Sequence, residues 1–376
     1  MKDVLLVEPR YNNLYPPLGL MRISTWRKRL GDHVDFHKEG FTTDYFGHKN
    51  TKLRKKYDII YITSLFTFHY PHVIECIKNY QIHYPDAKIK VGGVMATLLS
   101  DMIKKDTGIT SHKGLLKKAE KCPPDYSLFP KLTYSISLTS RGCIRRCNYC
   151  VVPIIEPSFF TREYWERDIN PKSERIVFWD NNWLCSPNFH KDVEKLKRIG
   201  KPYDFNQGLD CRLFDEEKAK LLSQTKLDPL RFAYDSPAQA PYIEKAIHIA
   251  EKHGFSDIRV YVLYNSKSKY DTQEYFYRRI NKLNQLKVVT YPMKYKPIDS
   301  TAPNWVSTRW NPEVLRGLKI VLRFFYKNGL IKKNRKIFSK MFGRDAKQFK
   351  RKMIMANRRD RAMDIERQSK KRSGAK

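Results

Sequence analysis

The residues best suited to chemistry are three cysteines in one short segment, Cys143, Cys147 and Cys150. Three thiolates on one loop can each bind an iron of a cubane cluster and leave the fourth iron without a protein ligand. An iron with an open position can bind a small molecule, which a fully ligated electron-transfer cluster cannot easily do. The segment therefore predicts a 4Fe-4S cluster with one open iron.

Two other interpretations fit the same spacing. A structural zinc site needs a fourth Cys or His, and this loop offers none. The i, i+4, i+7 spacing also matches one face of a helix, which would make the three thiols part of an apolar core. The neighbouring Arg141, Arg145 and Arg146 argue against an apolar face.

The segment resembles the motif of the radical S-adenosylmethionine (SAM) superfamily, and within it the branch that carries an N-terminal cobalamin-binding-like domain. The shared features are the Cys-x-x-x-Cys-x-x-Cys spacing, the Arg-Gly pair before Cys143 and the aromatic Tyr149 before Cys150. The resemblance implies that the open iron binds the amino and carboxylate groups of SAM. It also implies that an electron from the cluster cleaves SAM to a 5′-deoxyadenosyl radical, which removes hydrogen from a substrate. A flavodoxin- or ferredoxin-like reductant would then be a partner.

The chain ahead of the cysteines has the alternating strand and helix pattern of a doubly wound α/β sheet. We expect a Rossmann-like, cobalamin-binding-like domain over residues 1–110. Its expected strands are Asp3–Glu8, His33–His37, Tyr57–Ile62 and Lys88–Val91. Residues 111–133 are expected to be a linker, because they are polar and contain paired prolines.

A second βα series follows over residues 134–300, and it matches the partial (β/α)6 barrel of the radical SAM family. Its expected strands are Ser135–Thr139, Arg175–Trp179, Asp204–Gln207, Leu230–Tyr234, Ile258–Tyr264 and Lys287–Tyr291. In such barrels the chemistry lies at the C-terminal ends of the strands. Residues 301–330 are expected to contain a helix that packs on the barrel, and residues 331–376 a basic helical tail.

The resemblance implies SAM contacts at these strand ends, next to Tyr149. Asp180 is expected to accept from the SAM ammonium group, because Asp180-Asn181-Asn182 replaces the Gly-Gly-Glu-like turn of the family. Gln207 is a candidate for the ribose hydroxyls, and Arg212 for the SAM carboxylate. Asp235 is a second ribose candidate. Met293 is expected to flank the adenine.

Structural alternatives exist for several of these residues. Asp180 could form an Asx turn into the next element. Asp210 and Arg212 could form an ion pair that fixes their loop. Cys211 could donate a hydrogen atom to a product radical, or could be a buried thiol.

A literal Asp-x-His-x-x-Gly match occurs at residues 35–40. In cobalamin proteins the histidine of this motif follows the first strand and ligates cobalt. Here His37 falls on the second expected strand, so we interpret it as an ordinary strand residue. Cobalamin bound without a histidine ligand stays open as a further cofactor.

The chain is strongly basic, with a formal net charge of +34. Residues 331–376 contain 18 Lys or Arg and 4 Asp or Glu, and the rest of the chain is also basic. This favours a polyanionic partner, for which nucleic acid is the usual candidate, although a basic tail can also serve only solubility. No apolar run approaches the length of a membrane span, so no membrane partner is expected. The scattered cysteines outside the cluster segment suit a reducing cytoplasm better than a disulfide framework.

Our leading hypothesis is a radical SAM oxidoreductase or transferase, with charge favouring modification of a nucleic-acid base or a nucleotide. The competing hypothesis is a non-catalytic nucleic-acid-binding protein with a structural or redox-sensing iron–sulfur cluster. The two differ in the open iron, because a structural cluster normally has four protein ligands.

Overall fold

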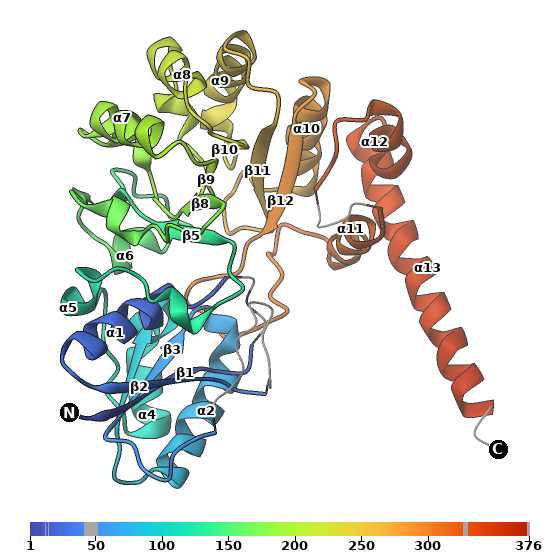
Figure 1. Cartoon of the computed structure of the whole chain (residues 1–376). Coiled ribbons are helices and arrows are strands. Elements are labelled where there is room, and N and C mark those ends of the chain that lie inside the picture. Colours follow the sequence, from blue (N-terminus) through green and yellow to red (C-terminus); the bar gives the residue numbers. More distant parts are fainter. Residues whose placement is uncertain (12, 14, 41–51, 326–329, 374–376) are drawn as a thin grey trace. The chain divides into compact units, whose positions relative to one another are not determined.

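The computed structural model describes residues 1–11, 13, 15–40, 52–325 and 330–373, with the backbone alone for residues 324, 325 and 364–373 (Figure 1). The chain has an α/β fold with parallel sheets, and it divides into two compact units. The first unit is Met1–Asn188 with Lys201–Tyr203 and Pro297–Pro303; the second is Phe189–Gly200, Asp204–Lys296 and Asn304–Lys376. Each unit is described separately.

The first unit begins with a four-stranded parallel sheet in the order β2-β1-β3-β4. Its strands are β1 (Asp3–Glu8), β2 (His33–Lys38), β3 (Ile59–Ser64) and β4 (Lys88–Gly93). The helices of this region are α1 (Leu18–Arg29), α2 (Tyr70–His83), α3 (Val94–Leu98) and α4 (Ser100–Thr107). These bounds agree closely with the strand ranges expected from the sequence.

The central strand β1 is buried on both faces. Val4 and Leu6 pack in one core with side chains of α1, and Leu5 and Val7 pack in a second core with side chains of α2. A continuous apolar strand is the pattern of a parallel sheet that is covered on both sides.

Residues 111–133 are packed, which corrects the expectation of a linker without packed elements. They contain α5 (Lys117–Glu120) and the 3-10 turn η2 (Tyr126–Leu128). Leu128, Phe129 and Leu132 are buried in the same core as Val4. The sequence did not indicate this burial, because the segment is mainly polar and contains prolines. These apolar side chains are buried because they pack against the four-stranded sheet.

The cysteine segment lies between the strands of a second sheet, which has the order β5-β8-β9. Strand β5 (Tyr134–Ser137) runs parallel to β8 (Arg175–Phe178), and Tyr203 of β9 (Tyr203–Phe205) belongs to the first unit. A short antiparallel pair, β6 (Ser140–Arg141) and β7 (Phe160–Thr161), closes the base of the cysteine loop. The loop also contains α6 (Val152–Ile155) and is followed by the 3-10 turn η3 (Trp165–Asp168).

The second unit contains a parallel sheet in the order β10-β11-β12. Its strands are β10 (Leu230–Ala233), β11 (Ile258–Tyr264) and β12 (Val289–Lys294), and its helices include α7 (Phe189–Ile199), α8 (Glu216–Ser223), α9 (Ala240–Lys252) and α10 (Gln273–Gln285). The six strands expected for a barrel are therefore present in two three-stranded sheets. Their closure into one partial barrel stays a prediction.

Three helices complete the second unit: α11 (Pro312–Phe325), α12 (Arg335–Phe342) and α13 (Ala346–Ser373), of which α11 and α13 pack against each other (Figure 1). Phe338, Phe342, Phe349 and Met353 are completely buried. The first part of the basic helical tail expected at 331–376 therefore packs within the unit through aromatic side chains that repeat at helical spacing. Among the described helices, none combines the length and apolar character needed to cross a bilayer.

Gly317 allows the close contact between α11 and α13. A Cβ atom at this position would lie 1.8 Å from the carbonyl oxygen of Met353. Gly317→Ala should therefore push the two helices apart and lower the free energy of unfolding by about 1–3 kcal/mol in chemical denaturation. Gly19→Ala in α1 is the matched control, because a Cβ there meets nothing within 4 Å. Equal stability of the two variants would contradict the packing.

Candidate metal centre

The three cysteines lie on the loop between β6 and α6; none of them forms a disulfide, and all three side chains are partly exposed. Backbone N–H groups of the loop point at two of the sulfurs: Arg145 N donates to Cys143 Sγ (3.3 Å) and Val152 N to Cys150 Sγ (3.4 Å). A turn in which Cys150 N donates to Cys147 O (3.0 Å) holds the middle of the segment. Such N–H···S hydrogen bonds are one of the means by which proteins tune iron–sulfur clusters.

A buried side chain also reaches the first cysteine. Asn182, which is 3% exposed and follows β8, donates from Nδ2 to Cys143 Sγ at 3.6 Å. This contact links the turn after β8 to the cysteine loop. A hydrogen bond to a ligating sulfur favours the more negatively charged, reduced form of a cluster.

The donor set fits a cluster better than a single ion. Among the described residues, no group of three or more His, Cys, Asp or Glu side chains is gathered closely enough to hold one metal ion. A cubane cluster does not require such a group, because each thiolate binds its own iron. Half-exposed thiols also disfavour the alternative of a plain apolar core. Ligation by Cys143, Cys147 and Cys150 stays a prediction, and the loop is suited to it.

Gly142 is required by the path of the loop. Its φ of +76° lies in the left-handed region, and a Cβ atom would lie 2.3 Å from the carbonyl oxygen of Ser158. Its N–H donates to Glu156 Oε2 at 2.8 Å. The glycine before the first cysteine therefore has a steric reason that is independent of any cofactor.

Arg141 fixes the two ends of the cysteine loop through hydrogen bonds to Glu120 and Glu156. Its Nε and Nη2 donate to the two carboxylate oxygens of Glu120 (3.0 and 2.7 Å), and its Nη1 donates to Glu156 Oε1 (2.9 Å). Glu156 Oε2 also accepts from Gly142 N and from Asn181 Nδ2 (3.0 Å). One buried guanidinium thus joins α5, the two ends of the cysteine loop and the turn after β8.

The ion network continues beyond Arg141. Arg22 of α1 donates from Nη2 to Asp168 Oδ2 (2.6 Å) and from Nη1 to the carbonyl oxygen of Glu120 (2.7 Å). Arg162 donates to the same Asp168 oxygen (2.6 Å) and to the carbonyl oxygen of Leu138 (2.7 Å). With Arg141 and Glu156, the network contains three guanidinium groups and three carboxylates, so its charges balance. Burial alone would raise the pKa of Glu120, but Arg141, Arg22 and Arg162 hold that pKa below its ordinary value.

Asp180 is buried at the end of β8, with its carboxylate engaged by the start of the cysteine loop. Oδ1 accepts from Thr139 Oγ1, Ser140 N and Ser140 Oγ (each 2.7 Å), and Oδ2 accepts from Thr139 N (3.0 Å). Burial raises the pKa of this carboxyl, and these hydrogen bonds oppose the shift. A carboxylate offers about four lone-pair sites, so the geometry favours a positioning role over the predicted contact with an ammonium group. Tyr149, the other candidate of this unit, is half-buried on the cysteine loop.

In the second unit, the candidates after β9 lie in different environments. Gln207 is exposed. Arg212 forms a bidentate pair with Asp210 (2.6 and 3.0 Å), which is the structural alternative left open by the sequence. Cys211 between them is 2% exposed, and burial raises its pKa to about 12, as expected for an inert buried thiol.

Two further candidates meet at the C-terminal ends of β10, β11 and β12. Asp235 Oδ1 accepts from Leu263 N at 2.8 Å, and Leu263 is paired in register with Met293. Met293 is 44% exposed. Asp235 follows β10 and Met293 is on β12, so the two candidates lie on the two strands that flank β11, at the C-terminal edge of the sheet where open parallel sheets bind ligands.

Asn265 orders this edge and was missed by sequence reasoning. It is completely buried with φ +67°, a conformation that few residues other than glycine adopt. Its Nδ2 donates to the carbonyl oxygen of Trp305 (3.2 Å), and its Oδ1 accepts from Ser307 N (2.9 Å). The only sequence signal was a polar residue directly after the strand.

Arg279 was also missed. Its guanidinium donates to the carbonyl oxygens of Tyr234 and Leu263 (each 2.8 Å) and to Asp271 Oδ1 (3.1 Å). It lies within α10, where an arginine at helical spacing looked like an ordinary surface residue. In the structure it ties together the C-terminal ends of β10 and β11.

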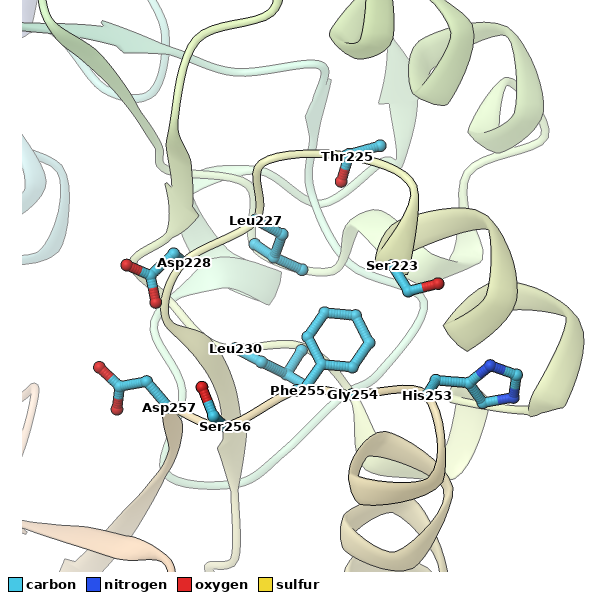
Figure 2. A pocket seen from close by; sticks show the side chains of 10 residues that line it. All are labelled: Ser223, Thr225, Leu227, Asp228, Leu230, His253, Gly254, Phe255, Ser256 and Asp257. Carbon is cyan, nitrogen blue, oxygen red and sulfur yellow. The ribbon is translucent and has the colours of Figure 1, made fainter.

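Figure 2 shows a pocket at the opposite end of this sheet. It is lined by the last residue of α8, the connection from α8 to the first residue of β10, and the connection between α9 and β11. Its lining includes Asp228, His253 and Asp257. In open parallel sheets ligands bind outside the carboxyl ends of the strands, and this pocket lies at the opposite ends.

Comparisons with known proteins add little to this description of the site. No protein-family model and no curated protein matches the chain. Among solved structures, the chain is similar to the apo, selenomethionine-labelled cobalamin-dependent S-adenosylmethionine radical enzyme OxsB, with 15% sequence identity and a TM-score of 0.38. The match covers 80% of this chain and 51% of that chain, so this chain spans about half the length of OxsB. A similarity at this level carries no functional argument.

The network around Glu120 predicts a defined pH dependence. Because the pKa of Glu120 is lowered in the folded state, its stabilising contribution is full above the ordinary carboxyl pKa of about 4.3 and is lost as the pH falls further. Glu120→Gln should lower the free energy of unfolding at pH 7 by about 3 kcal/mol, because Arg141 loses its buried partner. The difference from the wild-type protein should shrink below about pH 4.

Glu217→Gln is the control for this experiment, since Glu217 is exposed and pairs only at the surface with His190. Denaturant titrations of both variants between acid and neutral pH give the measurement. A difference between Glu120→Gln and wild type that does not change with pH would contradict the assignment.

Proposed function

We propose that this chain is a radical SAM enzyme that cleaves SAM reductively and uses the 5′-deoxyadenosyl radical to activate a C–H bond of its substrate. The observation that carries the proposal is the cysteine loop: three partly exposed thiols, two of which accept hydrogen bonds at sulfur, on a loop whose ends are held by the ion pairs of Arg141. A 4Fe-4S cluster, when bound, supplies the electron for this cleavage and an open iron for SAM. The electron itself comes from an external reductant.

The residues of the first unit hold and tune the cluster in this proposal. Cys143, Cys147 and Cys150 are the ligands. Arg141 and Glu156 fix the loop, so that the thiolates keep their spacing without a fourth protein ligand. Tyr149, half-buried on the same loop, is proposed as a contact for SAM.

Gln207, Arg212, Asp235 and Met293 are proposed as further SAM contacts. Gln207 and Asp235 have the donors and acceptors that ribose hydroxyls need. Arg212 offers a planar fork for a carboxylate, although Asp210 shares it in the structure. Met293, partly exposed at the end of β12, suits the face of an adenine ring.

The substrate class and the second cofactor are less constrained. The net charge of +34 favours a nucleic-acid base or a nucleotide as the substrate. Cobalt ligation by His37 is not part of the proposal, because this residue lies on β2 and its Nδ1 is hydrogen-bonded to the Tyr80 hydroxyl (2.6 Å). Cobalamin without a histidine ligand remains compatible with the four-stranded sheet.

Removing one predicted ligand separates the enzyme from the alternative, a non-catalytic nucleic-acid-binding protein with a structural or redox-sensing cluster. Anaerobically reconstituted wild-type protein should contain about four irons per chain and release 5′-deoxyadenosine with SAM and dithionite. Cys147→Ala should lose both the iron and the product. Cys211→Ala, which alters a buried thiol, should keep both.

Two outcomes would decide against the proposal. Product formation that survives Cys147→Ala would contradict the ligand assignment. A wild-type cluster whose spectrum does not change with SAM, and that releases no 5′-deoxyadenosine, would support the non-catalytic alternative.

Asn182 gives a test that does not depend on turnover. Removing its N–H···S hydrogen bond with Asn182→Ala should make the reduction potential of the cluster more negative, because the reduced form loses a donor at Cys143. Potentiometric titration followed by electron paramagnetic resonance gives the midpoint. Asn148→Ala, at an exposed position on the same loop, should leave it unchanged. Equal midpoints for both variants would show that the Asn182 contact does not act on the cluster.

A further inference from the structure

The end of β12 carries a group of lysines that repel one another. Lys294 ends the strand, Lys296 follows it, and Lys319 lies on α11. Partial burial lowers the pKa of Lys294 and of Lys296, and the nearby charge of Lys319 lowers both further. Lys294 and Lys319 are exposed, and a bound anion would favour the charged form of these ammonium groups.

Helix α11 extends this group as a basic stripe. Arg316, Lys319 and Arg323 are exposed and follow one another at i, i+3 and i+7. Leu315 and Leu318 on the other side of the helix are buried. The apolar face therefore packs into the unit, and the basic face is directed at solvent.

The stripe continues onto α13. Asn357 of α13 accepts from Arg316 Nε and donates to Glu313 Oε1 (3.3 Å in each case). These contacts place the middle of α13 beside the first turns of α11. Arg358 and Arg359, which follow Asn357, are exposed.

This basic surface begins at the edge of the sheet where Met293 and Asp235 lie. Trp310 Nε1 donates to the carbonyl oxygen of Asp271 (3.0 Å), and Asn311 N donates to Gln273 Oε1 (3.3 Å). Asp271 stands in the connection after β11. These contacts fix the start of α11 at the C-terminal ends of the strands.

We propose that this basic face, formed by Lys294, Lys296, Arg316, Lys319, Arg358 and Arg359, binds the phosphate backbone of a nucleic acid. The positive groups extend along one strand end and two helices, which suits a row of phosphates better than a single phosphate group. The proposal goes beyond the proposed SAM chemistry and does not rest on it, because binding can be measured without turnover.

The same helices argue against a membrane surface as the partner. Interfacial helices place aromatic and leucine side chains beside their basic residues, where they can enter the lipid. On α12 and α13 the aromatic side chains Phe338, Phe342 and Phe349 are completely buried inside the unit, and the exposed apolar side chains near Arg358 and Arg359 are two methionines, Met355 and Met363, rather than aromatic residues. The described solvent face of α11 presents basic groups.

The test compares two variants of the full-length protein that lose the same charge. Lys294→Gln/Lys319→Gln/Arg358→Gln neutralises the basic face. Lys220→Gln/Lys226→Gln/Lys245→Gln neutralises three exposed lysines on and after α8 and on α9. Neutralising Lys294 and Lys319 removes a repulsion, so the first variant should fold, and thermal unfolding of both variants checks this.

Fluorescence anisotropy with labelled single-stranded RNA, single-stranded DNA and duplex DNA of about 20 nucleotides measures affinity across a range of salt concentrations. Neutralising the basic face should weaken binding at least about 10-fold at 0.1 M salt and reduce the slope of log K against log salt by about 2, since each lost phosphate contact removes about 0.7–0.9. The control variant should keep the wild-type slope. The three probes show which nucleic acid binds best.

Three results would overturn the proposal. The wild-type protein could fail to bind any of the probes. Both triple variants could lose affinity equally, which would show that net charge alone matters. Phosphatidylserine vesicles could bind as tightly as RNA and respond to the same substitutions, which would identify a lipid surface instead.

Discussion

The structure around the cysteine loop depends on one buried guanidinium. Arg141 is the residue two before Cys143, and its three nitrogens donate to Glu120 and Glu156. Because Glu156 also accepts from Gly142 N, the charge of Arg141 fixes the backbone immediately before the first thiol. A lysine could not make this bidentate and bridging contact, since its ammonium group lacks the planar fork.

The network also explains why residues 111–133 are ordered. Glu120 belongs to this segment, and its carboxylate and carbonyl groups are both used by buried arginines. A segment whose charge neutralises Arg141 and Arg22 cannot move away without leaving those charges unpaired in the interior. The chain between the first sheet and the cysteine loop is therefore a part of the loop's support.

The sequence predicted local structure well, because the evidence for it is local. Short apolar runs that alternate with helical segments placed the strands of the three larger sheets within a few residues of their observed bounds. The cysteine spacing and the Arg-Gly pair also indicated where the site candidates begin. Sequence reasoning did not anticipate contacts between residues distant in the chain, such as Arg22 with Asp168 or Arg279 with the carbonyl oxygens of β10 and β11. A buried arginine in a helix has the same sequence signature as an exposed one.

The basic tail at residues 331–376 also shows which structural features the sequence alone does not determine. Its charge is visible in the composition, but the composition does not show that Phe338 and Phe349 are buried. Whether such a face meets solvent, a partner or the rest of the chain depends on the surface that α10 and α11 offer to it. The charge and the apolar spacing of a segment therefore determine which surfaces it could pack against. The complementary surface that the folded chain offers determines where it does pack. By the same reasoning, Asp180 has the chemistry of an ammonium acceptor, but the N–H and O–H groups of Thr139 and Ser140 already occupy it.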